Sequence, residues 1–196
     1  MKQTIVLATH NAGKIREFKS VLEPLGYTAT AVRDLCPQLL EPEETGTTFE
    51  ENARLKAAYY MKATGLPCLA DDSGIIADAL GGRPGVYSAR YAGPECDDEK
   101  NNQKLIDELS AFPLEERTVH YACVLALLFP DGREIVREGR CSGVLRNFYA
   151  GTNGFGYDPL FYVPEKGKTM AEMTMEEKNE ISHRGKALEL LVEALS

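Results

Sequence analysis

Residues 119–129, Val-His-Tyr-Ala-Cys-Val-Leu-Ala-Leu-Leu-Phe, form the longest apolar run of the chain. A nearly continuous apolar run of this kind predicts a central strand of a sheet. The turn Pro130-Asp131-Gly132 follows, and residues 134–141 predict a second strand that pairs with the first through this turn. The hairpin therefore predicts the sheet around which the rest of the chain is organised.

Strands and helices are mixed on both sides of this hairpin. We expect strands over residues 4–8, 66–70 and 160–163, and helices from about 15 to 25, 48 to 64, 97 to 109 and 174 to 195. Thr48-Phe49-Glu50-Glu51 has the capping-box pattern that opens a helix. With no internal repeat or linker, the pattern predicts one α/β domain over residues 1–196 with a mixed sheet.

Bulk composition excludes several classes of protein. The 196 residues carry a net charge of −8, with 43% hydrophobic and 27% charged residues, which argues against disorder and against a protein that coats nucleic acid. No apolar stretch approaches the roughly 20 residues of a membrane span, and the N-terminal apolar run is too short for a signal peptide. Five cysteines without a CxxC unit favour a reducing cytoplasm.

Asp71 and Asp72 come directly after the apolar run 66–70. Two adjacent carboxylates repel each other, which raises one pKa or recruits a metal ion. Glu44 precedes the second predicted helix and Lys56 lies within it, so Glu44 could join the aspartates around Mg²⁺. A solvated Asp-Asp turn and a solvated acidic loop are the alternative interpretations.

A polar turn separates the first predicted strand from the first helix. Backbone N–H groups at a helix start, short polar side chains and a lysine together suit a phosphate group. The Walker A pattern is absent, and Asn11 could simply cap the helix. The turn consists of Thr9, His10, Asn11, Ala12, Gly13 and Lys14.

Two further segments could bind a nucleobase. In the glycine-rich loop 151–159 the backbone can approach a ligand closely, and Phe155 could stack on a base. Lys178 and Ser182 would share one helical face, and His183 and Arg184 could hydrogen-bond a purine edge. A structural turn with a core Phe and a basic helix surface are the alternatives.

Six motifs occur in one order over essentially the whole chain. They resemble the non-canonical purine NTP pyrophosphatases, also called inosine triphosphate pyrophosphatases or the HAM1-like family. The motifs are Thr-x-Asn-x-x-Lys, Glu-Thr-Gly-x-Thr-Phe-x-Glu-Asn-Ala, Asp-Asp-Ser-Gly, Pro-Gly-x-x-Ser-Ala-Arg, Gly-Phe-Gly-Tyr-Asp-Pro and Ser-His-Arg.

The resemblance implies an activity and a residue assignment. The activity is hydrolysis of dITP, ITP and XTP to the monophosphate and pyrophosphate, in a two-lobed α/β homodimer with an elongated mixed sheet and an active-site cleft between the lobes. Glu44 and Asp72 would hold Mg²⁺ with Asp71 close by, and Asp72 would accept a proton. The charges of Lys14 and Lys56 would fit this chemistry by stabilising the leaving pyrophosphate. Substrate would be bound by Thr9 through Lys14 and by Ser73, Phe155, Gly156, Tyr157, Asp158, Lys178, His183 and Arg184.

Three other functions remain as alternatives. A Maf-type nucleotide pyrophosphatase would lack the Phe155–Asp158 and Ser182–Arg184 segments. An aspartyl-phosphate phosphatase would carry Asp-x-Asp after the first strand, where this chain has Thr9-His10-Asn11. A nucleotide-binding regulator without catalysis would have no use for a general base. The sequence therefore favours a magnesium-dependent pyrophosphatase.

Overall fold

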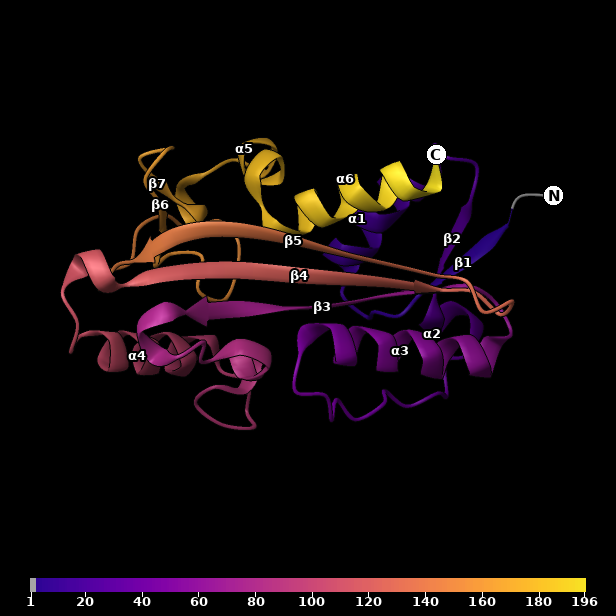
Figure 1. Ribbon diagram of the computed structural model, residues 1–196, viewed down its shortest axis with the longest axis horizontal. Helices are drawn as coiled ribbons and strands as arrows, with labels where there is room; N and C mark the ends of the chain where they lie inside the picture. The colour runs from indigo at the N-terminus through magenta and orange to yellow at the C-terminus, as the bar shows by residue number, and fades with distance from the viewer. Residues whose placement is uncertain (1–2) are drawn as a thin grey trace. The chain divides into compact units, whose positions relative to one another are not determined.

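The computed structural model describes residues 3–196 and contains a mixed sheet (Figure 1). The strand order is β2-β1-β3-β4-β5-β6-β7. β1 runs parallel to β2 and β3, whereas β6 is antiparallel to β5 and β7. The predicted α/β class is confirmed. The strands are β1 (Thr4–Leu7), β2 (Thr28–Ala31), β3 (Cys68–Ala77), β4 (Thr118–Leu128), β5 (Glu134–Leu145), β6 (Phe161–Val163) and β7 (Lys168–Thr169).

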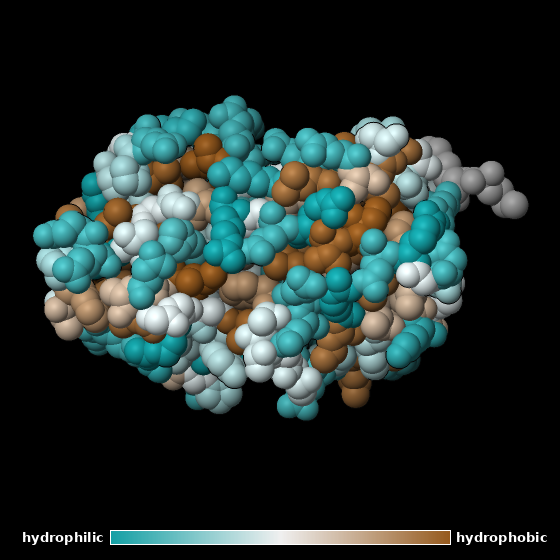
Figure 2. All heavy atoms as spheres, in the orientation of Figure 1, coloured by the Kyte–Doolittle hydropathy of each residue, from teal (hydrophilic) through white to brown (hydrophobic). Residues whose placement is uncertain are grey.

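Helices connect and cover these strands. Within residues 3–196, none of the helices combines the length and the apolar character that crossing a membrane requires. On the face shown in Figure 2, hydrophilic side chains are interspersed with apolar ones. The helices are α1 (Ala12–Leu22), α2 (Val32–Leu35), α3 (Phe49–Thr64), α4 (Asp98–Leu109), α5 (Met175–Ile181) and α6 (His183–Leu195).

The chain divides into two compact units. The first comprises the chain up to Asp72, Cys123–Gly139 and Lys186–Ser196, and the second comprises Ser73–Ala122 and Arg140–Gly185. The long strands β3, β4 and β5 each contribute residues to both units. Within residues 3–196, the first unit contains two buried apolar clusters and the second contains one.

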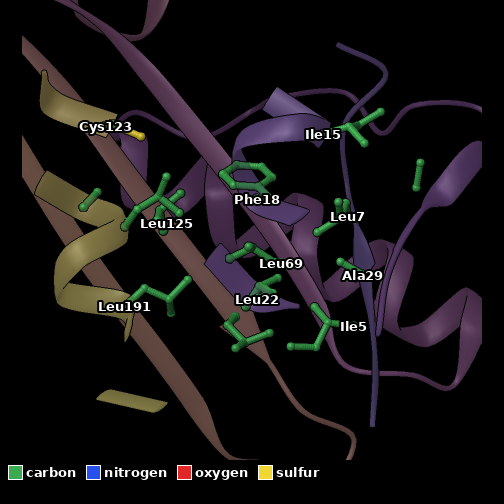
Figure 3. Close-up of a cluster of buried hydrophobic side chains, with 14 of the residues drawn as sticks. Ile5, Leu7, Ile15, Phe18, Leu22, Ala29, Leu69, Cys123, Leu125 and Leu191 are labelled. Atoms are coloured by element: carbon green, nitrogen blue, oxygen red, sulfur yellow. The ribbon is translucent and has the colours of Figure 1, made fainter. Parts of the chain in front are cut away.

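In the first unit, apolar side chains are buried on both faces of the sheet. Successive strand residues point to opposite faces, so Leu69 and Leu125 join one cluster, whereas Ala70 and Val124 join the other. Phe18 of α1 and Leu191 of α6 pack into the first cluster, as Figure 3 shows. Ala53, Ala57 and Tyr60 of α3 cover the opposite face.

The second unit is built around one apolar cluster. Leu105 and Leu109 of α4 pack with Tyr121 of β4 and Phe161 of β6. The loop before β6 contributes Tyr157 to the same cluster. This cluster therefore anchors the segments in which the sequence predicts base-binding residues.

The predicted hairpin is confirmed. β4 and β5 are neighbours in the sheet, and Asp131 Oδ1 accepts a hydrogen bond from Arg133 N at 3.0 Å in the turn. Gly132 has a φ of 89°, a conformation that suits glycine because it has no Cβ. The capping box at the start of α3 is also confirmed, because the Thr48 side chain accepts from Glu51 N.

The strand expected to end before Asp71 continues through it. β3 runs to Ala77, so Asp71 and Asp72 lie within a strand and are 1% and 9% exposed. The alternative of a solvated Asp-Asp turn is therefore wrong. The positive charges of Lys14 and Lys56 allow both carboxylates to be buried there.

The single helix expected over residues 174–195 is wrong. Ser182 is extended, with φ −66° and ψ 152°, and separates α5 from α6. Its Oγ accepts a hydrogen bond from Gly185 N at 3.1 Å, which satisfies a donor at the start of α6. Lys178 and Ser182 therefore do not share one helical face.

Among the α-helices and strands of residues 3–196, three have no counterpart in the sequence prediction. They are the short elements β2, α2 and β7. The strands among them are two to four residues long, too short for a clear alternation of apolar and polar residues. The first helix begins at Ala12 and ends at Leu22, three residues earlier than predicted.

Candidate active site

Asp71 and Asp72 project from opposite faces of β3. The alternation of strand side chains places Asp71 on the face of Leu69 and Asp72 on the face of Ala70. Lys14 of α1 contacts Asp71, with Nζ 2.8 Å from Oδ2. Asp72 faces α3. The two neighbouring carboxylates thus have different partners.

Asp72 is held by two side chains of α3. Asn52 Nδ2 donates to Asp72 Oδ2 at 3.0 Å, and Lys56 Nζ lies 3.9 Å from Oδ1. Lys56 Nζ also donates to Glu44 Oε1 at 2.7 Å. Asn52 and Lys56 are four residues apart, which places them on the same face of the helix. Glu44, Lys56 and Asp72 therefore form one group.

The electrostatics of this group perturb two ionisable side chains. Burial raises the pKa of Asp72 to about 6, and the charges of Glu44 and Asp71 add to this, whereas Lys56 and Asn52 oppose it. Burial by itself would lower the pKa of Lys56, but the carboxylates of Asp71, Asp72 and Glu44 raise it overall. Lys56 thus stays protonated at neutral pH. A carboxylate whose pKa lies near 6 suits a general base.

The turn before α1 is organised by Asn11 and Thr9. Asn11 Oδ1 accepts from Gly13 N at 2.8 Å and from Lys14 N at 3.1 Å, so the predicted cap is confirmed. Thr9 Oγ1 accepts from Asn11 N at 3.2 Å. The first turn of α1 contains no acidic residue, which keeps the positive end of the helix suitable for an anion.

His10 and Ala12 complete this turn. The exposed His10 pairs with Glu41, at 3.3 Å between Nε2 and Oε1. Ala12 is the first residue of α1. Ser73 follows Asp72 in β3 and is partly buried.

The carboxylates present suit Mg²⁺ in part. Glu44 and Asp72 both approach Lys56 Nζ, and each contributes hard oxygen atoms. Mg²⁺ is commonly bound by one or two carboxylates together with substrate phosphates and water. Within residues 3–196 no cluster of three or more acidic, His or Cys side chains could hold a metal ion. Asp71, paired with Lys14 on the other face, does not complete a three-carboxylate set.

In the second unit, Asp158 organises the predicted base-binding loop. Asp158 Oδ2 accepts from Phe155 N at 3.0 Å and from Lys178 Nζ at 2.5 Å. Lys178 Nζ lies 5.4 Å from the centroid of the Phe155 ring. Phe155 is 62% exposed, so its ring can accept a stacked base, and it does not belong to the core.

Helix α4 fixes the adjacent Gly156. Asp98 Oδ2 accepts from Gly156 N at 2.9 Å, and Asn102 Nδ2 donates to Gly156 O at 3.0 Å. Tyr157 points away from the exposed loop into the core, and its hydroxyl donates to Ser88 O at 2.7 Å. The side chain of Tyr157 therefore anchors the loop in the core, whereas the side chain of Phe155 is exposed.

The start of α6 brings two more predicted residues into the second unit. The His183 ring stacks on Tyr121, with centroids 4.8 Å apart and an interplanar angle of 19°. Arg184, next in the helix, is 9% exposed. Lys178 reaches Asp158 from α5. The structure thus connects Phe155, Asp158 and Lys178 by contacts.

Sequence reasoning missed four residues that position these groups. Asn52 was visible within the motif Glu-Thr-Gly-x-Thr-Phe-x-Glu-Asn-Ala, but nothing in its spacing shows that it contacts Asp72. The other three are Asp98, Asn102 and Tyr121. They lie far from their partners in sequence, so no local pattern could have revealed them.

Comparison with known proteins extends over nearly the whole chain. Relatives named dITP/XTP pyrophosphatase from Geobacter sulfurreducens and Thermus thermophilus are 52% and 54% identical to it. Both alignments cover 97% of this chain. They cover 96% of the Geobacter relative and 90% of the Thermus relative. The solved structure of the Staphylococcus aureus Ham1 protein matches with a TM-score of 0.92 and 44% identity, over 98% of each chain.

The sequence model of the Ham1 family matches residues 5–194. This range includes each predicted site residue, from Thr9 to Arg184. The match confirms the resemblance drawn from the six motifs. The chain belongs to the Ham1 family.

Proposed function

We propose that this protein hydrolyses non-canonical purine nucleoside triphosphates, dITP, ITP and XTP, to the monophosphate and pyrophosphate. Membership of the Ham1 family and relatives named dITP/XTP pyrophosphatase support this activity. The observation that carries the chemistry is the buried Asp72, which is held by Asn52 and Lys56 and has a raised pKa of about 6.

The phosphates would be handled by residues of the first unit. Glu44 and Asp72 would hold Mg²⁺, which when bound would neutralise the triphosphate and polarise the α-phosphorus. Asp72 would orient a water molecule and remove its proton for in-line attack on that phosphorus. Lys14 and Lys56 would stabilise the charge that develops on the leaving pyrophosphate.

Three residues have roles that differ from those in the simplest form of this proposal. Asp71 is paired with Lys14 and would hold that lysine in place, and it would not bind the metal ion directly. Asn11 and Thr9 would shape the phosphate-binding turn, because their side chains accept backbone hydrogen bonds.

The purine would be recognised by residues of the second unit. Phe155 offers an exposed ring for stacking, and Arg184 would donate to the 6-oxo group that hypoxanthine and xanthine carry. Adenine has an amino donor at that position, so a buried arginine would face it without an acceptor.

An assay of products tests the activity. The protein is incubated with Mg²⁺ and ITP, XTP, GTP or ATP, and products are separated by ion-exchange chromatography. IMP and pyrophosphate from ITP support the proposal. IDP and phosphate, or no turnover of any triphosphate, would overturn it. Chelation of Mg²⁺ by EDTA, followed by its restoration, tests the metal requirement separately.

The Arg184→Ala variant tests base recognition. We expect the ratio of kcat/KM for ITP to that for ATP to fall by about tenfold or more, because removal of one directed donor costs about this much. Steady-state kinetics on both substrates measure the ratio. An unchanged ratio would exclude Arg184 from recognition of the 6-position.

We further propose a homodimer in the cytoplasm. The six-motif resemblance supports the dimer, and the five cysteines, none of which forms a disulfide bond within residues 3–196, suit a reducing compartment. Light scattering coupled to size-exclusion chromatography tests the oligomeric state. A mass near 21.6 kDa at micromolar concentration would show a monomer instead.

A further inference from the structure

Tyr121 connects two groups of the second unit that the proposed function assigns to the purine. It lies on β4 and is 8% exposed. Its ring stacks on Phe161, at 4.5 Å between centroids and 15° between planes, and on His183, at 4.8 Å and 19°. One face of the His183 imidazole is therefore covered by a buried aromatic ring.

The hydroxyl group of Tyr121 lies beside the carboxylate of Asp158. Burial raises the pKa of Tyr121 well above its usual value, and the charge of Asp158 adds to this effect. The hydroxyl group thus remains protonated, and a protonated hydroxyl group can donate to a neighbouring carboxylate.

Asp158 accepts hydrogen bonds from two groups of the protein itself. They are Phe155 N and Lys178 Nζ, at 3.0 and 2.5 Å from Oδ2. A carboxylate that accepts a backbone N–H and a lysine ammonium group is fixed in orientation. It can hold the Phe155 loop and Lys178 in place without contacting the base.

We propose that Tyr121 is a positioning residue for purine binding, which fixes the His183 imidazole by stacking and the Asp158 carboxylate by its hydroxyl group. The inference rests on the proposed function, because it takes the purine as the ligand of these residues. Tyr121 itself need not contact the substrate. Through Asp158 and His183 it holds the groups in place before the nucleotide arrives.

Fixed groups matter most for a choice between bases that differ in one donor. A mobile imidazole or ammonium can rotate to suit the wrong base, whereas a group held in one orientation leaves that base with an unpaired polar atom. Preorganisation also reduces the entropy that binding must otherwise overcome. Loss of the Tyr121 hydroxyl should therefore weaken binding and selectivity, and it should spare the chemistry at Asp72.

The variant Tyr121→Phe keeps the ring and removes only the hydroxyl group. We expect KM for ITP to rise about tenfold, as loss of a hydrogen bond to a charged group implies, with kcat within about twofold. The preference for ITP over ATP should fall in parallel. Tyr121→Leu, which also removes the stacking ring, should raise KM further.

Tyr91→Phe is the matched control. Its hydroxyl group donates to Glu108 Oε2 at 2.7 Å in the same unit, so the variant loses a hydroxyl group that faces a different carboxylate. We expect its KM to equal that of the unsubstituted protein. Melting temperatures of all variants separate a change in folding from a change in binding.

The outcomes are distinct. Turnover of ITP by the unsubstituted protein tests the proposed function, whereas the comparison with Tyr121→Phe tests the inference. An unchanged KM in Tyr121→Phe, or a fall in kcat at constant KM, would overturn the inference. If that variant does not fold, Phe161→Leu loosens the Tyr121 ring from its other contact, and an unchanged KM there would overturn it equally.

Discussion

Asp71 and Asp72 are neighbours in sequence whose side chains have different surroundings. Asp71 pairs with Lys14 of α1, and Asp72 receives Asn52 and approaches Lys56, both of α3. The cause is the alternation of side chains along a strand. This alternation places one carboxylate beside Lys14 and the other beside Asn52 of α3.

The Asp72→Asn variant should lose activity and retain binding. Asparagine has nearly the same shape but cannot accept a proton from water, so we expect kcat for ITP to fall by about 10³-fold. Calorimetry should show ITP binding within about tenfold of the unsubstituted affinity, since the other phosphate and base contacts remain. Hydrolysis at the unsubstituted rate would remove Asp72 from the role of base.

The same variant should stabilise the metal-free protein at high pH. The pKa of Asp72 is raised by burial to about 6, above its ordinary 3.8, so folding favours the protonated form. Stability from this group is fully present below the ordinary pKa and is lost as pH rises through about 6. In EDTA, the melting temperature of Asp72→Asn should exceed that of the unsubstituted protein at pH 8.

The comparison at low pH supplies the control for this effect. Near pH 4 both proteins carry a neutral side chain at position 72, so the difference in melting temperature should nearly vanish. The other titrating groups are the same in both proteins, so their contributions cancel in the difference between the two melting temperatures. An equal difference in melting temperature at pH 4 and pH 8 would contradict the raised pKa of Asp72.

At the scale of elements, a loop, a helix and a strand meet at Asn52. This residue of α3 is fully buried, donates to Asp72 of β3 and accepts from Gly46 N at 2.8 Å. A Cβ on Gly46 would lie 2.6 Å from Asn52 Oδ1 and 3.0 Å from Asn52 N. The loop therefore needs glycine at this point to close on the helix, only two residues after Glu44.

The Asn52→Ala variant tests whether this junction positions Asp72. We expect kcat to fall by about 10- to 100-fold, because a small displacement of a reacting group has effects of this size. Asn101→Ala is the control, since Asn101 is also buried, accepts from Ala92 N and donates to Ala89 O. Both variants should have a lower melting temperature than the unsubstituted protein, but only Asn52→Ala should have a lower kcat. Equal kcat values would exclude the positioning role.

At the scale of the whole molecule, the two units share three strands. β3 passes from the first unit to the second at Ser73, and β4 and β5 also contribute residues to both. A strand keeps its register through hydrogen bonds along its whole length. Loss of one unit would therefore remove support from the strands of the other.

The protein should consequently unfold in one transition. We expect calorimetric and van't Hoff enthalpies to agree, and Phe18→Ala, in the first unit, to lower stability by about 3–5 kcal/mol. Hydrogen exchange should show the same loss of protection in β1 of the first unit and β6 of the second. Two unfolding transitions, or a loss of protection from exchange that is confined to β1, would show that the units unfold independently.

The sequence by itself determined the α/β class, the β4–β5 hairpin and the capped start of α3. Each depends on neighbouring residues: a continuous apolar run, a glycine in a turn, and a Thr and Glu three positions apart. The six motifs also identified the family, because their order is written in the chain. Local chemistry suffices for features of this kind.

Only the tertiary structure decided what each site residue contacts. It divided the two aspartates between α1 and α3, broke the last helix at Ser182, and brought Asn52 to Asp72 and Tyr121 to His183. The physical reason is sequence distance. Partners 20 to 62 positions apart become neighbours only when strands pair and helices pack, and no local periodicity records that packing.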